Sequence, residues 1–199
     1  GAYQHALNFA LERKQGHSPV DGGNGTIVDH ADVRRMLLSM KADVFASRAI
    51  ALSCAMAIDL ANANGDAHWK TRAALLTPIN KAFGTDTGIR VSEMGLQVHG
   101  GMGFIEETGA AQYCRDVRVT AIYEGTNGIQ AMDLVGRKMM DDGAATFTLI
   151  EEIKAGVEAA SDSELAVQVG LAADALRATT QKLATSGSMN DRFAGAVPY

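Results

Sequence analysis

The feature that most constrains the fold of this chain is a long run of helical periodicity in its first third. Apolar residues recur there at intervals of three or four positions, the spacing of one face of an α-helix: Val33, Met36, Leu37, Met40 and Val44. Asp29 is a suitable N-cap, and the pattern persists to about Ala63, where Asn64 and Gly65 end it. A helical bundle is the fold class that this pattern favours.

Other parts of the chain carry the same signal. Helices or helical turns are expected over residues 1–15, 66–76, 78–99, 110–116 and 126–140. Thr77 is a suitable N-cap with Pro78 at the first helical position, which predicts a separate helix from there toward His99. Beyond Gly143 the apolar spacing indicates two more amphipathic helices, and no strand is predicted. We therefore expect an all-α fold: an antiparallel four-helix bundle over residues 1–140 and a helical extension over residues 141–199.

Composition excludes several classes of function. The chain has 199 residues, of which 47% are hydrophobic and 6% aromatic, and a net charge of -5 without a basic run. Nucleic acid and an anionic membrane surface are therefore not expected as partners. No run of consecutive apolar residues is long enough to span a bilayer. Cys54 and Cys114 match no metal or redox spacing, so free thiols in a reducing compartment, the cytoplasm by default, are expected.

The sequence lacks the residue spacings of the common metal and dinucleotide sites. None of the five histidines follows an Asp or Glu at the spacing of a di-iron Glu-x-x-His motif, and no zinc spacing occurs. Gly101 and Gly103 resemble the start of a dinucleotide fingerprint, but Glu106 occupies the third glycine position and no strand precedes it. No metal site and no Rossmann site are predicted.

One carboxylate stands out. Glu124 follows an apolar run and precedes Gly125 and Thr126. Thr126 can cap the next helix, and Gly125 lets another molecule approach the backbone. Against an aromatic and aliphatic wall the carboxylate of Glu124 would be partly desolvated, and its pKa would rise toward that of a general base. The alternative is an ordinary turn before an amphipathic helix.

Four motifs resemble one family, the acyl-CoA dehydrogenases, over residues 1–140. They are Ala10–Gly16, Gln97–Phe104, Arg115–Asp116 and Tyr123–Thr126. The match is to the C-terminal helical domain of that family, and the extension is similar to a long-tailed subgroup that includes the methylmercaptopropionyl-CoA dehydrogenases. Complete members also have an N-terminal helical domain and a middle β-domain, so we expect this chain to be a fragment.

The resemblance implies a flavin-dependent α,β-dehydrogenation of an acyl-CoA thioester. It assigns Glu124 as the catalytic base, and Tyr123, Glu124 and Gly125 as residues that contact the substrate. It assigns FAD contacts to five residues: Arg13, Gln97, Gly100, Gly101 and Thr126. Of these, Gln97, Gly100 and Gly101 would reach the flavin of a neighbouring subunit.

The same resemblance implies binding partners for the full-length protein and a loss of activity in the isolated fragment. It implies a homo-oligomer, a dimer or a tetramer, with an electron-transfer flavoprotein as acceptor. The isolated fragment is expected to be inactive and to bind FAD weakly or not at all, because a stacking surface for the isoalloxazine ring is missing. The alternative from another class is a helical assembly module without chemistry of its own.

Overall fold

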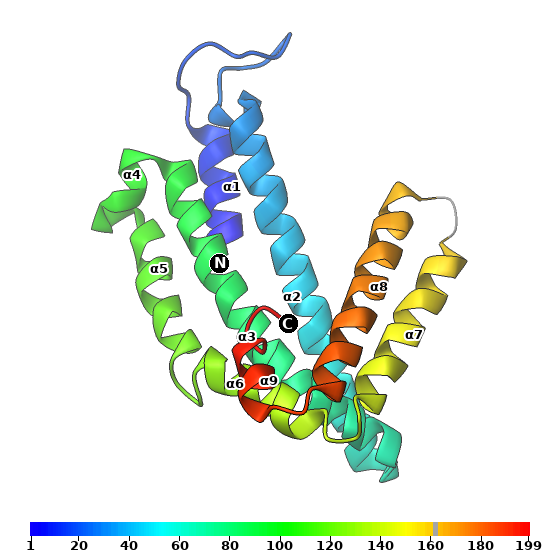
Figure 1. Ribbon diagram of the computed structural model, residues 1–199. Helices are drawn as coiled ribbons and strands as arrows, with labels where there is room; N and C mark the ends of the chain where they lie inside the picture. Colours follow the sequence, from blue (N-terminus) through cyan, green and yellow to red (C-terminus); the bar gives the residue numbers. More distant parts are fainter. Residues whose placement is uncertain (161–162) are drawn as a thin grey trace. The chain divides into compact units, whose positions relative to one another are not determined.

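The computed structural model describes residues 1–160 and 163–199, which fold into α-helices joined by short connections (Figure 1). The α-helices are α1 (Ala2–Glu12), α2 (Ala31–Asn64), α3 (Ala67–His99), α4 (Gly101–Phe104), α5 (Ala110–Arg118), α6 (Asn127–Asp133), α7 (Ala144–Ala159), α8 (Glu164–Thr185) and α9 (Met189–Ala194). Short 3-10 helices lie at Ile27–Asp29, Glu106–Thr108 and Val119–Ala121, and a π-helix lies at Leu134–Lys138. Across the described residues there is no strand, only an isolated bridge between Lys14 and Thr26, so the all-α prediction is confirmed.

The chain divides into two compact units. The first unit comprises Gly1–Leu52 and Phe83–Glu124, and the second comprises Ser53–Ala82 and Gly125–Tyr199. The long helices α2 and α3 contribute a segment to each unit. Each unit is therefore described by itself.

The first unit is a four-helix bundle made by α1, α2, α3 and α5 (Figure 1). Its core joins residues from α1, the start of α2 and the end of α3: Ala6, Ala10, Ile27, Met36, Leu37, Met40, Val91 and Val98. Alanines on the buried face of α1 let its backbone approach α2 and α3 closely, and Met40 fills the space between them with no exposed surface. The helical spacing that predicted α2 therefore marks its buried face in this unit.

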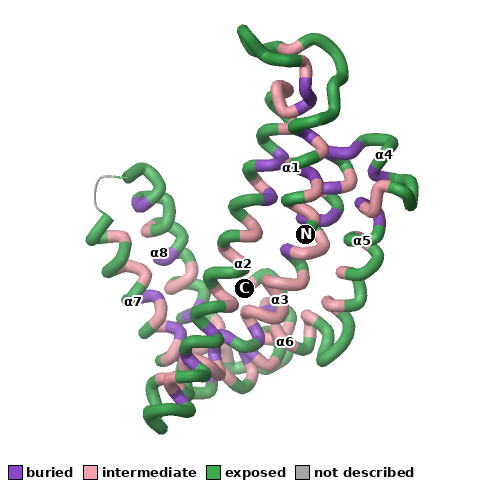
Figure 2. The backbone as a smooth tube through the Cα atoms, turned by 180° about the vertical axis from the view of Figure 1, so that it is seen from behind, coloured by how far each residue is buried: buried purple, intermediate pink, exposed green. Residues whose placement is uncertain are grey.

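The second unit contains α6–α9 and the connected parts of α2 and α3. Helices α7 and α8 pack side by side, with Ile150, Ala166 and Ala173 buried along them (Figure 2). Ser163 caps α8 by accepting a hydrogen bond from the backbone N–H of Ala166 at 3.2 Å. The two helices predicted beyond Gly143 are present as α7 and α8, and α9 follows them.

The prediction of a helix start at Pro78 is wrong. Helix α3 runs without a break from Ala67 to His99, with Pro78 inside it. The hydroxyl of Thr77 donates to the carbonyl of Ala73 at 2.7 Å, so it bonds backward within the helix and does not cap a new one. Pro78 removes one backbone hydrogen bond. Pro78 is buried, as are Leu75 and Leu76 before it, so packing on this segment offsets that loss.

The expected cap of α2 also differs. Asp29 lies in the 3-10 helix before α2, and its carboxylate accepts from the backbone N–H of Gly25 at 3.1 Å. Helix α2 begins at Ala31. The side chain of Asp29 therefore closes the preceding loop instead of starting the long helix.

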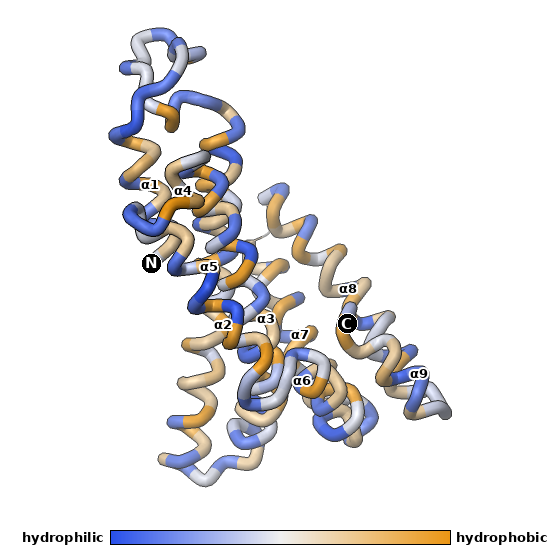
Figure 3. The backbone as a smooth tube through the Cα atoms, turned by 90° about the vertical axis from the view of Figure 1, so that its left-hand side faces the viewer, coloured by the Kyte–Doolittle hydropathy of each residue, from blue (hydrophilic) through white to orange (hydrophobic). Residues whose placement is uncertain are grey.

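The prediction that no apolar run is long enough to span a bilayer needs correction for one helix. Helix α2 contains an 18-residue window with a mean hydropathy of 1.6, and only 17% of that window is buried. Figure 3 shows apolar residues recurring along α2, and Leu38, Phe45 and Leu52 are exposed on it. Apolar residues spaced between polar ones reach this value without forming a continuous run. Length and composition alone do not distinguish a spanning helix from one covered by other parts of a larger protein.

Candidate functional site

The turn that carries the predicted base has an uncommon backbone conformation. It lies between the 3-10 helix Val119–Ala121 and α6, and Glu124 and Gly125 have φ angles of 53° and 81°. Glu124 is one of two non-glycine residues with a positive φ in the part of the chain that the structure describes. The left-handed conformation costs an L-residue about 1 to 2 kcal/mol, and such strain concentrates at functional sites.

The residues around this turn are open to solvent. Glu124 is exposed, Tyr123 is 50% exposed and Ile122 is 55% exposed. The apolar wall expected around the carboxylate is therefore not closed by the residues that the structure describes. Desolvation of Glu124 remains a prediction that depends on what covers the turn, such as a bound acyl chain or another part of the protein.

The two residues after Glu124 have clear local roles. Gly125 has a left-handed φ, and a Cβ at this position would lie 3.2 Å from Nε2 of Gln130 and 3.5 Å from Cγ2 of Ile129. Both conformation and space thus favour glycine. The hydroxyl of Thr126 accepts from the backbone N–H of Ile129 at 3.3 Å, which makes it the N-cap of α6, as predicted from the sequence.

A lysine that the sequence analysis missed holds this turn within the second unit. Nζ of Lys81, on α3, donates to the carbonyl of Gly125 at 2.7 Å and to Oδ1 of Asn127 at 2.8 Å. Nδ2 of Asn127 donates to the carbonyl of Ala82 at 3.4 Å. These bonds join the turn to α3 across more than forty positions of sequence, and no local motif could have indicated them.

The predicted flavin-binding loop lies at the end of α3 in the first unit. Gly100 has a φ of 58° and a ψ of -138°, a conformation that glycine alone adopts readily, and Gly101 begins α4. A Cβ on either residue would meet no atom of the chain within 4 Å. Gly103 differs, because a Cβ there would lie 2.3 Å from the carbonyl oxygen of Leu96. The first two glycines thus present open backbone, and the third allows close packing.

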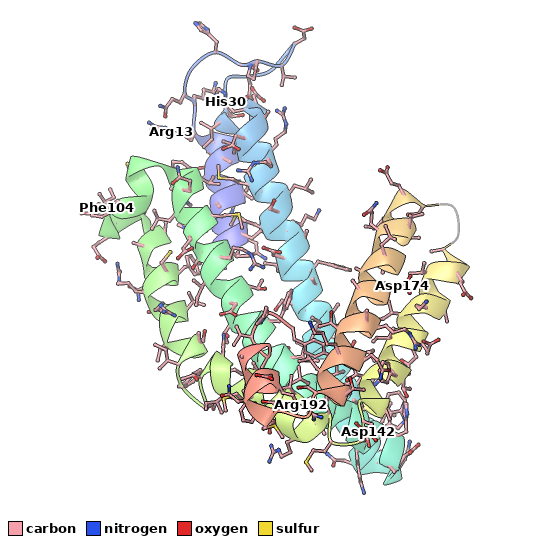
Figure 4. All side chains as sticks on the ribbon, in the orientation of Figure 1. Arg13, His30, Phe104, Asp142, Asp174 and Arg192 are labelled. Atoms are coloured by element: carbon pink, nitrogen blue, oxygen red, sulfur yellow. The ribbon has the colours of Figure 1, made fainter. Side chains whose placement is uncertain are left out.

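Arg13 lies at the same end of the first unit as this loop. Phe9, one turn earlier on α1, stacks on His99 with ring centroids 4.4 Å apart, which places the end of α1 beside the end of α3. The side chain of Arg13 points outward near His30 (Figure 4) and is exposed, and it forms no ion pair with the described residues. Gln97 is also exposed. The structure thus brings Arg13, Gln97, Gly100 and Gly101 to one end of the unit.

Glu124 lies at the other end of the first unit. Helix α5 begins near α4 and runs away from it, and Glu124 follows the far end of α5 (Figure 1). Within this unit the predicted base and the predicted flavin contacts of Arg13 and the glycine loop are therefore not neighbours.

The surface beside the loop carries apolar side chains. Phe104 projects outward and is 81% exposed, and Met102 is 41% exposed (Figure 4). A hollow of about 570 Å³ beside it is lined by Leu96, Phe104, Ile105, Glu106, Glu107, Ala111, Cys114 and Arg115. Burial of these side chains against another surface would be favourable.

Arg115 and Asp116 do not pair with each other. The guanidinium of Arg115 donates to the carboxylate of Glu106 at 2.7 Å, and Asp116 accepts from the amide of Gln112. Arg115 therefore joins α5 to the 3-10 helix Glu106–Thr108. Glu107 forms no ion pair among the residues described.

His99 is buried next to the loop. Its Nδ1 donates to the carbonyl of Gly95 at 2.7 Å, whereas its Nε2 and Nδ1 of His5 are buried without a hydrogen-bond partner among the described residues. Burial lowers the pKa of His99 below its ordinary value of 6.5, and the neighbouring His5 adds to this effect. Burial therefore disfavours the protonated form of this imidazole.

No group of three or more His, Cys, Asp or Glu side chains suited to a metal ion occurs among the described residues. Cys54 and Cys114 are free thiols, of which the first is buried.

Comparisons with known proteins indicate the same family as the sequence motifs. Residues 1–140 match the family of the acyl-CoA dehydrogenase C-terminal domain. The chain is 42% identical to the 3-methylmercaptopropionyl-CoA dehydrogenase of Ruegeria pomeroyi, over all of this chain and 36% of that protein. It is 31% identical to a butyryl-CoA dehydrogenase of Syntrophomonas wolfei, over 92% of this chain and 31% of that protein. The chain thus spans about a third of the length of these relatives.

Solved structures show the same fold. The apo form of Bd2924 superposes with a TM-score of 0.74 at 21% identity, over 99% of this chain and 35% of that protein. Caenorhabditis elegans ACDH-11, solved in complex with C11-CoA, superposes with a TM-score of 0.63 at 18% identity, over 98% of this chain and 35% of that protein. With the sequence match over residues 1–140, the conclusion is direct: the chain belongs to the acyl-CoA dehydrogenase family and contains its C-terminal helical domain.

Proposed function

We propose that the longer protein containing this chain is an FAD-dependent acyl-CoA dehydrogenase that forms a double bond between Cα and Cβ of an acyl-CoA thioester. The observation that carries the proposal is the conformation of Glu124. It is a solvent-exposed carboxylate held in a left-handed turn, at the position that the resemblance assigns to the base. Non-glycine residues held in the left-handed region concentrate at functional sites, which fits this assignment.

In this proposal Glu124 removes the α-proton of the substrate. That proton is weakly acidic until the thioester carbonyl is polarised, so a hydrogen bond from the backbone N–H of Glu124 to the carbonyl oxygen would share the work. Tyr123 would line the acyl pocket, and Gly125 would allow close approach of the substrate to the backbone. FAD supplies the acceptor for the hydride that leaves Cβ.

The residues predicted to contact FAD fit such a group. Arg13 is exposed without an ion pair to a described residue, and its planar guanidinium suits the oxygens of a pyrophosphate. Gly100 and Gly101 leave room for a ligand against the backbone, and Gln97 is exposed. The hydroxyl of Thr126, which accepts from Ile129, can still donate to a ligand.

Separation of Arg13, Gln97, Gly100 and Gly101 from Glu124 favours a site shared between subunits. The glycine loop lies at the opposite end of the first unit from Glu124, as expected if it reaches the flavin of a neighbouring subunit. We therefore propose a homo-oligomer in which each flavin is contacted by two chains. An electron-transfer flavoprotein as acceptor and a cytoplasmic location are parts of the same proposal.

The test is reduction of the flavin by substrate in the full-length protein. We expect it to purify yellow and to lose its visible flavin absorbance when butyryl-CoA or 3-methylmercaptopropionyl-CoA is added without an electron acceptor. Acetyl-CoA is the matched control, because it has no Cβ and cannot be dehydrogenated between Cα and Cβ. A protein that purifies without flavin, or whose flavin no acyl-CoA in such a panel reduces, would support the assembly module instead.

A further inference from the structure

Lys81 joins the turn that follows Glu124 to α3. Lys81 donates from Nζ to the carbonyl of Gly125 and to Oδ1 of Asn127, at 2.7 and 2.8 Å. All three residues belong to the second unit, and Lys81 is half-buried on a long helix. Both hydrogen bonds come from a charged donor, which makes them stronger than bonds between neutral groups.

The backbone at this point needs such a restraint. Gly125 separates Glu124 from Thr126, and glycine has more conformational freedom than any other residue. Thr126 is fixed on its other side by the cap of α6. The carbonyl of Gly125 belongs to the peptide group that joins Gly125 to Thr126, so fixing its orientation limits the rotation of Gly125 directly after Glu124. Lys81 fixes that carbonyl from a helix, and side chains held on helices place a site more accurately than loops do.

Asn127 adds a second hydrogen bond between α6 and α3. Its Oδ1 accepts from Lys81, and its Nδ2 donates to the carbonyl of Ala82 at 3.4 Å. The ammonium and the amide therefore bind one another and span the first turn of α6 and the middle of α3. We call this group, Lys81 with Gly125 and Asn127, the turn clamp.

We propose that Lys81 is a positioning residue for the proton-abstraction step: through the turn clamp it keeps Glu124 in the left-handed conformation from which it would reach the α-proton. The inference rests on the proposed function, because it assigns Lys81 a role in a reaction that Glu124 must perform. Lys81 itself touches neither substrate nor flavin in this proposal.

The experiment uses the full-length protein with its flavin bound and follows flavin reduction in a single turnover. Lys81→Met keeps most of the length and apolar stem of the side chain but removes the donor. We expect the limiting rate constant of reduction to fall about tenfold or more, since small misplacements of a reacting group cost one to two orders of magnitude. The dissociation constant of the substrate should change far less, because binding is not the step affected.

Two further variants separate positioning from general loss of structure. Lys81→Arg keeps a charged donor of similar reach and should restore most of the rate. Lys70→Met is the matched control, because Lys70 lies three turns earlier on the same helix and is exposed. It should reduce flavin at the wild-type rate. If Lys81→Met does not retain flavin, Lys81→Arg is compared with Lys81→Gln instead. Glutamine is shorter and uncharged, so Lys81→Gln should then be the slower variant.

The outcomes keep the two proposals apart. Reduction by Lys81→Met at the wild-type rate, with Glu124→Gln inactive, would overturn the turn clamp and leave the base assignment standing. Equal slowing by Lys81→Met and Lys81→Arg would also overturn it, because a charged donor would then not be what matters. If Glu124→Gln itself reduces flavin normally, the base assignment fails first.

Discussion

Two glycine-containing segments carry the predicted chemistry, and they are held in different ways. The loop of residues 97–104 is shaped mainly by its own glycines: Gly100 adopts a conformation that other residues avoid, and Gly103 lies against the carbonyl of Leu96. The turn of residues 123–126 contains a strained non-glycine residue, Glu124, and its Gly125 carbonyl accepts a hydrogen bond from Lys81 in a distant part of the chain.

The difference follows from what each segment would do. A loop that offers backbone to a phosphate group needs only the right main-chain shape, which glycine provides locally. A turn that aims a carboxylate at one proton needs a fixed side-chain direction, and this requires support from a rigid element. The two segments should therefore respond differently to substitution.

The largest effect is expected at Glu124. Glu124→Gln keeps the volume of the side chain but removes the proton acceptor, so flavin and acyl-CoA should still bind to the full-length protein. The rate of flavin reduction in a single turnover should fall by about 10²-fold or more, as general-base catalysis contributes at least that much. Stopped-flow absorbance measures it.

The control for this variant is Glu107→Gln, which should retain the wild-type rate. Glu107 lies in the 3-10 helix Glu106–Thr108 without an ion pair to a described residue, whereas Glu106 binds Arg115 and would confound the comparison. Normal reduction by Glu124→Gln would place the base elsewhere and remove the functional contrast between the two segments.

Much of the fold could be predicted because its signals are local. The spacing of apolar residues predicts α2. Thr126 predicts the start of α6, and in the structure it is the N-cap of that helix. Pro78 misled the prediction, because the same Thr-Pro pair fits a helix start and the interior of a helix. Packing of the surrounding residues decides whether the pair starts a helix or lies inside one, and this packing depends on the tertiary structure.

The site was predictable only in part, for a related reason. Glu124, Gly125 and Thr126 are contiguous, so a motif identifies them. Lys81 and Gly125 are 44 positions apart, and only the folded chain brings them together. The exposure of Glu124 could not be foreseen either, since the apolar residues before it do not cover it.

A smaller effect, this time on stability, is expected at Gly103. A Cβ there would lie 2.3 Å from the carbonyl oxygen of Leu96, closer than any real contact, so the backbone would have to move. Gly103→Ala should lower the free energy of unfolding of the isolated chain by about 1 to 3 kcal/mol, the usual cost of overpacking. Urea denaturation followed by circular dichroism measures this, and an unchanged midpoint would contradict the packing role.

The buried His99 should make the same end of the first unit sensitive to acid. Its folded-state pKa is lowered below 6.5 by burial, so above that pH the imidazole is neutral in both the folded and the unfolded chain. As the pH falls below 6.5, the unfolded chain takes up a proton that the folded chain resists, and stability is lost progressively.

Urea midpoints measured between about pH 7.5 and 5.5 test this prediction. The decline should be smaller in His99→Gln, which cannot be protonated there. The ring centroid of His5 lies 4.6 Å from that of His99. The variant His5→Gln is therefore needed as a control for the contribution of His5 to the pH dependence. Equal pH dependence in the wild type and in His99→Gln would show that other groups cause the loss.

The smallest effect is expected at Gly101, and it sharpens the comparison within the loop itself. No atom of the chain lies within 4 Å of a Cβ at this position, and its φ is not left-handed, so alanine fits. Gly101→Ala should change the free energy of unfolding of the isolated chain by no more than about 0.5 kcal/mol, in contrast to Gly103→Ala. In the full-length protein the same methyl group would occupy space that we assign to FAD, so flavin content after purification should decrease although the fold is intact. Gly101→Ala protein with full flavin content would mean that the open backbone at this glycine does not face the cofactor.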